Sequence, residues 1–217
     1  MKYKYILFDL DGTLTDPGLG ITNSVMHALE KFDIRVEDRT ELYKFIGPPL
    51  LASFERYYKL SKEDCERALH YYREYFSVKG LYENEVYEGI AELLRTLKQE
   101  GRKVILATSK PDKFSIRILE HFRLLEYFDF IAASTMDEKR TDKAEVIAYA
   151  IENMGIDDKS KVIMIGDREH DIFGAVKNGI ESIGVTYGYG GFEELKNAGA
   201  TYTVDSVEEL SELLKRN

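Results

Sequence analysis

Short apolar runs alternate with segments of helical periodicity along most of this chain, and this alternation is the feature that most restricts its fold. The first run, residues 3–9, is nearly continuous and apolar toward its end. Four similar runs follow, at residues 103–108, 128–132, 162–166 and 180–185. Runs of this kind are typical of strands buried on both faces of a parallel sheet. Helical segments between them supply the crossover connections, so we predict an α/β protein.

One long segment, residues 16–83, departs from this alternation. It has no strand pattern and shows helical spacing at residues 19–32, 40–46, 50–60 and 63–79. Further helices are expected from residue 90 to Gly101, from Pro111 onward, and at 142–154, 169–178 and 206–216. We therefore predict a Rossmann-like, doubly wound parallel sheet formed by residues 1–15 and 84–217. An all-helical domain, residues 16–83, is inserted after its first strand.

The charge and cysteine content exclude several classes of partner. The net charge of the 217 residues is −9, and no cluster of Lys and Arg stands out, so nucleic acid polymers and membranes are not expected partners. A single cysteine forms no internal disulfide, and no stretch resembles an export signal or a bilayer-spanning helix. We expect a cytoplasmic protein that is a monomer or a weak homodimer.

Polar residues that can carry chemistry follow the predicted strands. They are Asp9, Asp11, Gly12, Thr108, Lys143, Asp167 and Asp171. The carboxyl ends of strands in an open α/β sheet are where ligands bind. If the first strand neighbours the 162–166 strand, the four carboxylates converge, and they repel one another unless a cation lies among them. Mg²⁺ prefers oxygen ligands and often bridges to a phosphate, so it is the expected cofactor.

Two further side chains suit a phosphorylated ligand. The ammonium of Lys143 and the hydroxyl of Thr108 would offset and bind phosphoryl oxygens, helped by backbone N–H groups of the turn from Asp9 to Gly12. Each residue alone has an ordinary explanation: Thr108 as a helix cap, Lys143 as a solvated lysine. Their occurrence together at one sheet edge favours a phosphoryl site.

Four sequence motifs resemble those of the haloacid dehalogenase-like hydrolase superfamily. They are Phe-Asp-Leu-Asp-Gly-Thr-Leu at 8–14, Ala-Thr-Ser-Lys-Pro at 107–111, Lys143, and Ile-Gly-Asp at 165–167 with Asp171. The resemblance implies that Asp9 attacks phosphorus and forms an aspartyl phosphate. It implies that Asp11 protonates the leaving oxygen and then activates water, while Thr108 and Lys143 bind phosphoryl oxygens.

The same resemblance implies the remaining site residues. Asp9, the backbone carbonyl of Asp11 and Asp167 would hold Mg²⁺, with Asp171 supporting the metal from behind. The helical insert is similar to a small cap that closes over the site. Substrate contacts are then expected from Gly12, Thr13, Ser109 and Lys110 in the core, and from Lys44, Gly47 and Pro48 in the cap.

Residues 45–50 and 184–190 are similar to the phosphoglycolate phosphatase-like group, in particular its 5′-nucleotidase-like members. The resemblance therefore implies a Mg²⁺-dependent phosphatase acting on a small phosphorylated metabolite, either phosphoglycolate or a nucleoside 5′-monophosphate. Asp11 argues against a dehalogenase, which replaces that residue. Ile21 argues against a sugar-phosphate mutase, which carries histidine there.

Two alternatives remain open. One is a phosphatase acting on phosphotyrosine in a protein or a flexible peptide. The other is a catalytically idle binding protein on the same fold, because a fold alone does not specify a function.

Overall fold

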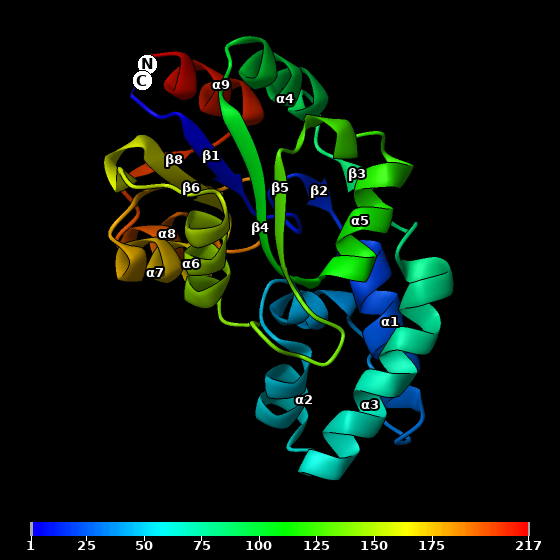
Figure 1. Ribbon diagram of the computed structural model, residues 1–217. Helices are drawn as coiled ribbons and strands as arrows, with labels where there is room; N and C mark the ends of the chain where they lie inside the picture. Colours follow the sequence, from blue (N-terminus) through cyan, green and yellow to red (C-terminus); the bar gives the residue numbers. More distant parts are fainter. Residues whose placement is uncertain (1, 217) are drawn as a thin grey trace. The chain divides into compact units, whose positions relative to one another are not determined.

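The main sheet of the computed structural model, which describes residues 2–216, has six parallel strands in the order β5-β4-β1-β6-β7-β8. The strands are β1 (Tyr5–Phe8), β4 (Lys103–Pro111), β5 (Phe130–Ser134), β6 (Val162–Gly166), β7 (Glu181–Val185) and β8 (Tyr202–Val204). β1 therefore lies inside the sheet, between β4 and β6 (Figure 1). The predicted doubly wound α/β fold is confirmed.

Helices cover both faces of this sheet. They are α4 (Ile90–Gln99), α5 (Asp112–His121), α6 (Lys143–Asn153), α7 (Glu169–Asn178), α8 (Gly191–Asn197) and α9 (Val207–Arg216), with short 3₁₀ turns η3 (Leu125–Tyr127) and η4 (Lys159–Lys161). In Figure 1, α5 and α6 flank β4 and β5 on opposite sides. On one face, Leu7, Ile105 and Met164 pack against Val146 and Ile147 of α6. The alternate residues of each strand point to the other face, as the pleat requires.

The strands differ from the sequence prediction at several places. β1 spans only Tyr5–Phe8 of the predicted residues 3–9, and β4 continues beyond residue 108 to Pro111. β5 begins at Phe130 and not at residue 128, because η3 ends at Tyr127 and Asp129 turns its carboxylate back to the N–H of Val104. β8 and α8 are absent from the prediction: β8 has only three residues and no apolar run. The 180–185 run is therefore not the last strand of the sheet.

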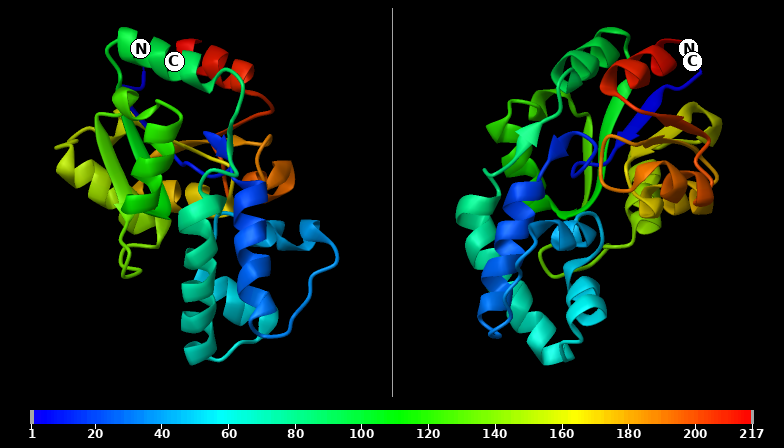
Figure 2. Two further views of the ribbon diagram at one scale, coloured as in Figure 1. Left: turned by 90° about the vertical axis from the view of Figure 1, so that its right-hand side faces the viewer. Right: turned by 180° about the vertical axis from the view of Figure 1, so that it is seen from behind.

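The chain divides into two compact units, residues 1–15 with 86–217 (the core unit) and residues 16–85 (the helical unit). Two short strands, β2 (Thr15–Asp16) and β3 (Glu85–Val86), pair with each other at the two chain connections. Figure 2 shows the ribbon from two further sides, with the helical unit in blue and cyan.

The helical unit consists of α1 (Gly18–Glu30), the 3₁₀ helix η1 (Arg39–Phe45), α2 (Leu50–Tyr58), α3 (Lys62–Tyr75) and the π-helical turn η2 (Phe76–Gly80). The sequence predicted one helix over 63–79, and the π turn breaks its regularity. The turn ends where the chain packs closely on α1, since a Cβ on Gly20 would lie 1.9 Å from the Gly80 carbonyl oxygen. This close backbone approach is a tertiary contact that helical periodicity does not reveal.

Aromatic rings pack against one another inside the helical unit. Tyr72 stacks on Phe76 at 5.3 Å between ring centroids, and Tyr57 lies 5.6 Å from Phe45.

Across residues 2–216, no helix combines the length and apolar character needed to cross a bilayer.

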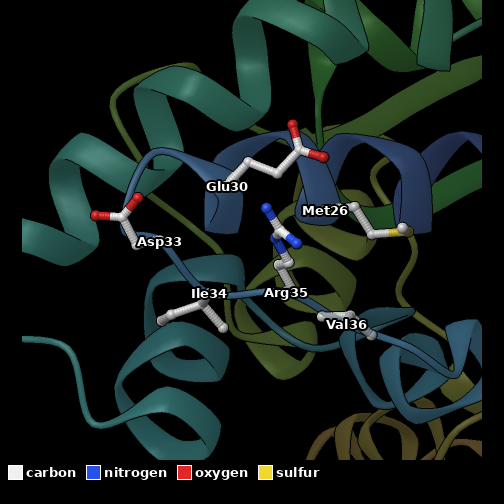
Figure 3. A pocket seen from close by; sticks show the side chains of 6 residues that line it. All are labelled: Met26, Glu30, Asp33, Ile34, Arg35 and Val36. Atoms are coloured by element: carbon white, nitrogen blue, oxygen red, sulfur yellow. The ribbon is translucent and has the colours of Figure 1, made fainter.

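The helical unit also carries a surface pocket of about 570 Å³ (Figure 3). It is lined by Met26, Glu30, Asp33, Ile34, Arg35 and Val36. None of the predicted site residues lines this pocket, so it is a feature separate from the site described next.

Candidate active site

Sheet register brings the predicted core residues to one edge. Phe8 of β1 is in register with Leu106 of β4 and with Ile165 of β6. Asp9 follows Phe8 directly, and Thr108 and Asp167 lie two residues beyond its partners. Since all three strands are parallel, these side chains gather at the same carboxyl edge, in the middle of the sheet.

Lys143 occupies the centre of this edge. It is the first residue of α6, and its ammonium nitrogen lies 2.8 Å from Asp9 Oδ1 and 2.8 Å from Asp171 Oδ1. The ammonium also donates a hydrogen bond of 3.0 Å to the carbonyl oxygen of Ala107. Only 6% of Lys143 is exposed, so the sequence-based alternative of a solvated surface lysine is wrong.

Three carboxylates surround a single position beside this lysine. Asp9, Asp167 and Asp171 each offer an oxygen within 4.8 Å of the others, and all three residues are buried. Asp167 Oδ1 has no hydrogen-bond partner among residues 2–216. Three carboxylates and one ammonium leave two negative charges in a buried space, which is costly unless a cation is bound. Donor chemistry and net charge both fit a divalent cation such as Mg²⁺.

The pKa values of Asp167 and Asp171 are both raised, chiefly by burial. Burial, reinforced by the charge of Asp171, raises the pKa of Asp167 well above its usual range. Burial raises the pKa of Asp171 to about 6, although Lys143 opposes the shift. For Lys143, burial alone would lower the pKa, but Asp171 and Asp9 outweigh it and raise the pKa. The lysine therefore remains charged.

Asp11 lies beside this group but has a different partner. Its Oδ2 accepts a hydrogen bond of 2.5 Å from the ammonium of Lys110. Burial raises the pKa of Asp11 above its usual value, and Lys110 opposes that shift without cancelling it. Asp11 is thus the carboxyl group of the turn that holds a proton more readily than an exposed aspartate does.

The turn after β1 is held by internal hydrogen bonds. The N–H of Asp9 donates to Ile165 O at 2.9 Å, and the N–H of Gly12 donates to Thr15 O at 2.8 Å. These two amides are therefore engaged inside the protein, unlike in the sequence prediction, which assigned turn amides from Asp9 to Gly12 to a ligand. The amides of Leu10 and Asp11 remain candidates for that role.

Gly12 is required at its position for two reasons. Its φ of +78° is strained for any residue with a side chain, and an added Cβ would lie 2.2 Å from Asp167 Oδ2. Gly12 thus contributes by letting the turn approach Asp167. Thr13 follows, fully buried.

The β4 end supplies the remaining core candidates. Thr108 is 2% exposed, and its Oγ1 accepts a hydrogen bond of 3.2 Å from the N–H of Lys110. Ser109 is half-buried between them. Both hydroxyls lie on the strand next to β1, at the level of the Asp9 turn.

The three predicted cap contacts belong to the helical unit. Lys44 lies in η1, with its ammonium 4.6 Å from the ring centre of Tyr57. Gly47 has a φ of +99°, and Pro48 follows it in the connection to α2. Their contact with a substrate stays a prediction.

A loop that the sequence interpretation gave no role also contacts this site. The N–H of Tyr189, after β7, donates a hydrogen bond of 2.8 Å to Asp167 Oδ2. The Tyr-Gly-Tyr-Gly run at 187–190 was a signal for it, because closely spaced glycines after a strand indicate a close backbone approach.

Comparison with known families gives one match that spans most of the chain. Residues 6–185 match the family described as haloacid dehalogenase-like hydrolase. This range contains all but the first residue of β1, the whole of β6 and the helical unit.

Individual relatives agree with this match over nearly full length. A 5′-nucleotidase of Pseudomonas aeruginosa is 43% identical over 99% of this chain and 97% of its own. The crystal structure of a predicted phosphatase from Clostridium acetobutylicum is 54% identical, covers 100% of both chains and superposes with a TM-score of 0.97. The tyrosine-protein kinase PtkA of Mycobacterium tuberculosis is 34% identical over 97% of this chain and 72% of its own.

Proposed function

The chain belongs to the haloacid dehalogenase-like hydrolase family, and from this membership we propose that it is a Mg²⁺-dependent nucleoside 5′-monophosphate phosphatase with Asp9 as its nucleophile. That the chain is a phosphatase follows from its relatives. The observation that carries the proposed mechanism is the pairing of Asp9 with the buried Lys143 at 2.8 Å, beside a protonatable Asp11.

In the first step, a carboxylate oxygen of Asp9 forms a bond to phosphorus as the bond from phosphorus to the ester oxygen breaks. The raised pKa of Asp11 lets it carry the proton that the leaving oxygen receives. Lys110 lies 2.5 Å from Asp11, and a substrate phosphoryl group that attracts this ammonium favours the protonated form of Asp11.

In the second step, water attacks the phosphorus of the aspartyl phosphate. Asp11, now a carboxylate, accepts the proton of that water, and the bond between Asp9 and phosphorus breaks to release phosphate. Lys143 and the hydroxyl of Thr108 hold phosphoryl oxygens in both steps, so that charge developing on them is offset.

Asp9, Asp167 and the backbone carbonyl of Asp11 would hold Mg²⁺, with Asp171 supporting them, and the ion would neutralise negative charge on the phosphoryl group. The free Oδ1 of Asp167 and the two uncompensated negative charges support this assignment.

The nucleotide is chosen over phosphoglycolate because the 5′-nucleotidase of P. aeruginosa matches this chain at 43% over almost its whole length. The helical unit, residues 16–85, would act as the cap that recognises the nucleoside, with Lys44, Gly47 and Pro48 as the predicted contacts.

The proposal is tested by measuring phosphate release from a panel of phosphomonoesters, with Mg²⁺ and with a chelator. The panel contains nucleoside 5′-monophosphates, phosphoglycolate, sugar phosphates and a phosphotyrosine peptide. We expect metal-dependent release, fastest from the nucleotides, and a loss on the order of 10⁵-fold in Asp9→Asn.

Asp129→Asn serves as the matched control, since Asp129 is a partly buried aspartate of the same unit that lies away from the Asp9 edge and binds two lysines. Preference for phosphoglycolate would overturn the substrate and keep the mechanism. Fastest release from the peptide would favour the phosphotyrosine alternative, which the similarity to a tyrosine-protein kinase makes worth including. No release from any compound would reject the catalytic proposal.

A further inference from the structure

The loop between β7 and α8, residues 186–190 (the 186–190 loop), lies directly against Asp167. Besides the hydrogen bond from Tyr189 N–H to Asp167 Oδ2, Gly188 lies so close to the same side chain that a Cβ would overlap it. A Cβ on Gly188 would lie 2.4 Å from Asp167 Cβ, and one on Gly190 would lie 2.2 Å from Asp167 O. A side chain at position 188 or 190 would overlap Asp167, so the backbone of the loop packs directly against this aspartate.

The same loop also contacts the turn that carries Asp9 and Asp11. The hydroxyl of Tyr187 donates a hydrogen bond of 3.0 Å to the carbonyl oxygen of Thr13. The Gly188 position is again close, because its added Cβ would lie 2.4 Å from the carbonyl oxygen of Gly12. One loop therefore bridges two turns that supply metal-binding candidates from different strands.

The loop is itself anchored at both ends. At its start, the N–H of Thr186 donates to Val204 O of β8 at 2.9 Å. Beyond its end, Glu194 of α8 accepts hydrogen bonds from Arg168 Nε at 2.8 Å and from the N–H of Glu169 at 2.9 Å. Because the loop is held on both sides, its backbone can keep Asp167 and the Asp9–Thr13 turn in fixed positions.

The ring of Tyr187 is held as firmly as its hydroxyl. It meets the ring of Tyr87 edge to face at 4.9 Å between centroids. Tyr87 in turn donates its N–H to Leu14 O at 3.2 Å, in the same turn as Thr13. The Tyr187 ring packing and hydrogen bond thus both lead to the segment that follows Asp11.

We propose that Tyr187 is a positioning residue whose hydroxyl holds the Asp9–Thr13 turn at the distance from Asp167 that a divalent cation requires. The proposal rests on the metal site of the proposed function and adds a determinant of its affinity. Partners of this kind, which orient ligands without touching the metal, typically change metal affinity by about 10–100-fold when removed.

The test is Tyr187→Phe, which keeps the ring against Tyr87 and removes only the hydroxyl. Electron paramagnetic resonance measures the concentration of free Mn²⁺ and therefore its affinity for the protein. We expect this affinity to weaken about tenfold. At low Mg²⁺ the phosphatase rate should fall, and raising Mg²⁺ should restore kcat with KM for the phosphomonoester unchanged. A purely structural role would not produce rescue by metal.

Tyr3→Phe is the matched control. Tyr3 is a buried tyrosine of the same unit whose hydroxyl donates a hydrogen bond of 2.7 Å to Glu181, a comparable contact outside the site. We expect it to lose stability without changing Mn²⁺ affinity. A second variant, Gly188→Ala, places a methyl group against Gly12 O and Asp167 and should weaken Mn²⁺ binding further.

The outcomes separate the two proposals. If the wild type and Tyr187→Phe bind Mn²⁺ with equal affinity, the positioning role of Tyr187 is overturned and the metal site still stands. No Mn²⁺ binding by the folded wild type would overturn both. Weakened binding in Tyr187→Phe and Gly188→Ala, but not in Tyr3→Phe, would support the inference.

Discussion

Two clusters in the core unit use the same charges in opposite arrangements. At the Asp9 edge, one lysine, Lys143, lies between two aspartates at 2.8 Å each. Between η3 and β5, one aspartate, Asp129, lies between two lysines, with Lys98 at 2.8 Å and Lys103 at 2.9 Å. Asp129 also accepts the N–H of Val104 at 3.0 Å, so its oxygens are satisfied.

The two clusters differ in what they leave unsatisfied. Asp129 is partly solvated at 14% side-chain exposure, and its pKa is lowered because hydrogen bonds from the two lysines outweigh burial. The Lys143 cluster is buried and has three carboxyl groups for one ammonium, with a carboxylate oxygen of Asp167 that has no partner among the described residues. The first arrangement stabilises the folded state by itself. The second leaves buried carboxylate oxygens unpaired, and such unpaired buried charge is typical of a binding site.

The largest expected effect is a difference in stability between variants of Lys143, at the Asp9 edge, and of Lys98, which binds Asp129. Lys143→Met leaves Asp9 and Asp171 without their shared cation, and breaking a buried ion pair costs about 3–5 kcal/mol. Urea unfolding at neutral pH in a chelator should show this loss in the free energy of unfolding. Lys98→Met removes one of the two lysines that bind Asp129. It should cost about 1 kcal/mol or less, since Lys103 remains. Equal losses in the free energy of unfolding of the two variants would show that the two clusters do not differ in this way.

The next effect concerns metal. Because burial raises the pKa of Asp167, its carboxylate destabilises the metal-free fold at neutral pH, and Asp167→Asn should not lower Tm in chelator. Mg²⁺ at about one hundred times its Kd should add about 2.7 kcal/mol to the wild type, a rise of roughly 5–10 °C. The variant should show no such rise in differential scanning calorimetry. A wild type whose Tm ignores Mg²⁺ would contradict the assignment.

A smaller effect is expected at Asp129 and depends on pH. Asp129→Asn should lower the free energy of unfolding by about 1 kcal/mol at neutral pH. Because the folded-state pKa lies below the ordinary value of 3.8, this stabilisation is present above that pH and is lost as the pH falls through the lowered pKa. Unfolding curves of wild type and variant at pH 7 and near pH 2 measure the difference. A gap that persists at the lower pH would have another cause.

The smallest effect is expected for Lys103→Gln. This lysine is 46% exposed, and Asp129 keeps both Lys98 and the Val104 N–H when it is removed. We expect a change of about 0.5 kcal/mol or less, further reduced by salt. The corresponding change at the buried cluster, Asp171→Asn, removes the charge of one of the two carboxylates that pair with Lys143, and its effect on Tm should not diminish with added salt. Similar salt sensitivity of the two variants would indicate that burial matters less than proposed.

Sequence reasoning located the site residues through strand ends. Asp9, Thr108 and Asp167 each follow a short apolar run, and their convergence needed only the assumption that the first strand neighbours the 162–166 strand, which the register confirms. That neighbourhood is a long-range pairing, so local pattern alone could not supply it. For the same reason the pairing of Lys143 with Asp9 and Asp171 was not predicted.

The features that were missed depend on tertiary contacts or on very short elements. β8 is three residues long and is recognisable only from its pairing with β7. The role of the 186–190 loop depends on the backbone contact between Gly188 and Asp167, for which the repeated glycines are only a hint. Gly12 was expected to present its N–H, but that N–H closes the turn on Thr15.

The pairing of β2 with β3 also bears on how such chains diversify. Paired strands lie about 4.8 Å apart, so the chain leaves the core unit and returns to it at nearly the same point. Seventy residues, 16–85, are thus attached through a gap that a tight turn could bridge. Evolution can therefore shorten, enlarge or exchange this module as one piece, with the catalytic sheet inherited unchanged, and a laboratory graft at Thr15 and Val86 has the same freedom.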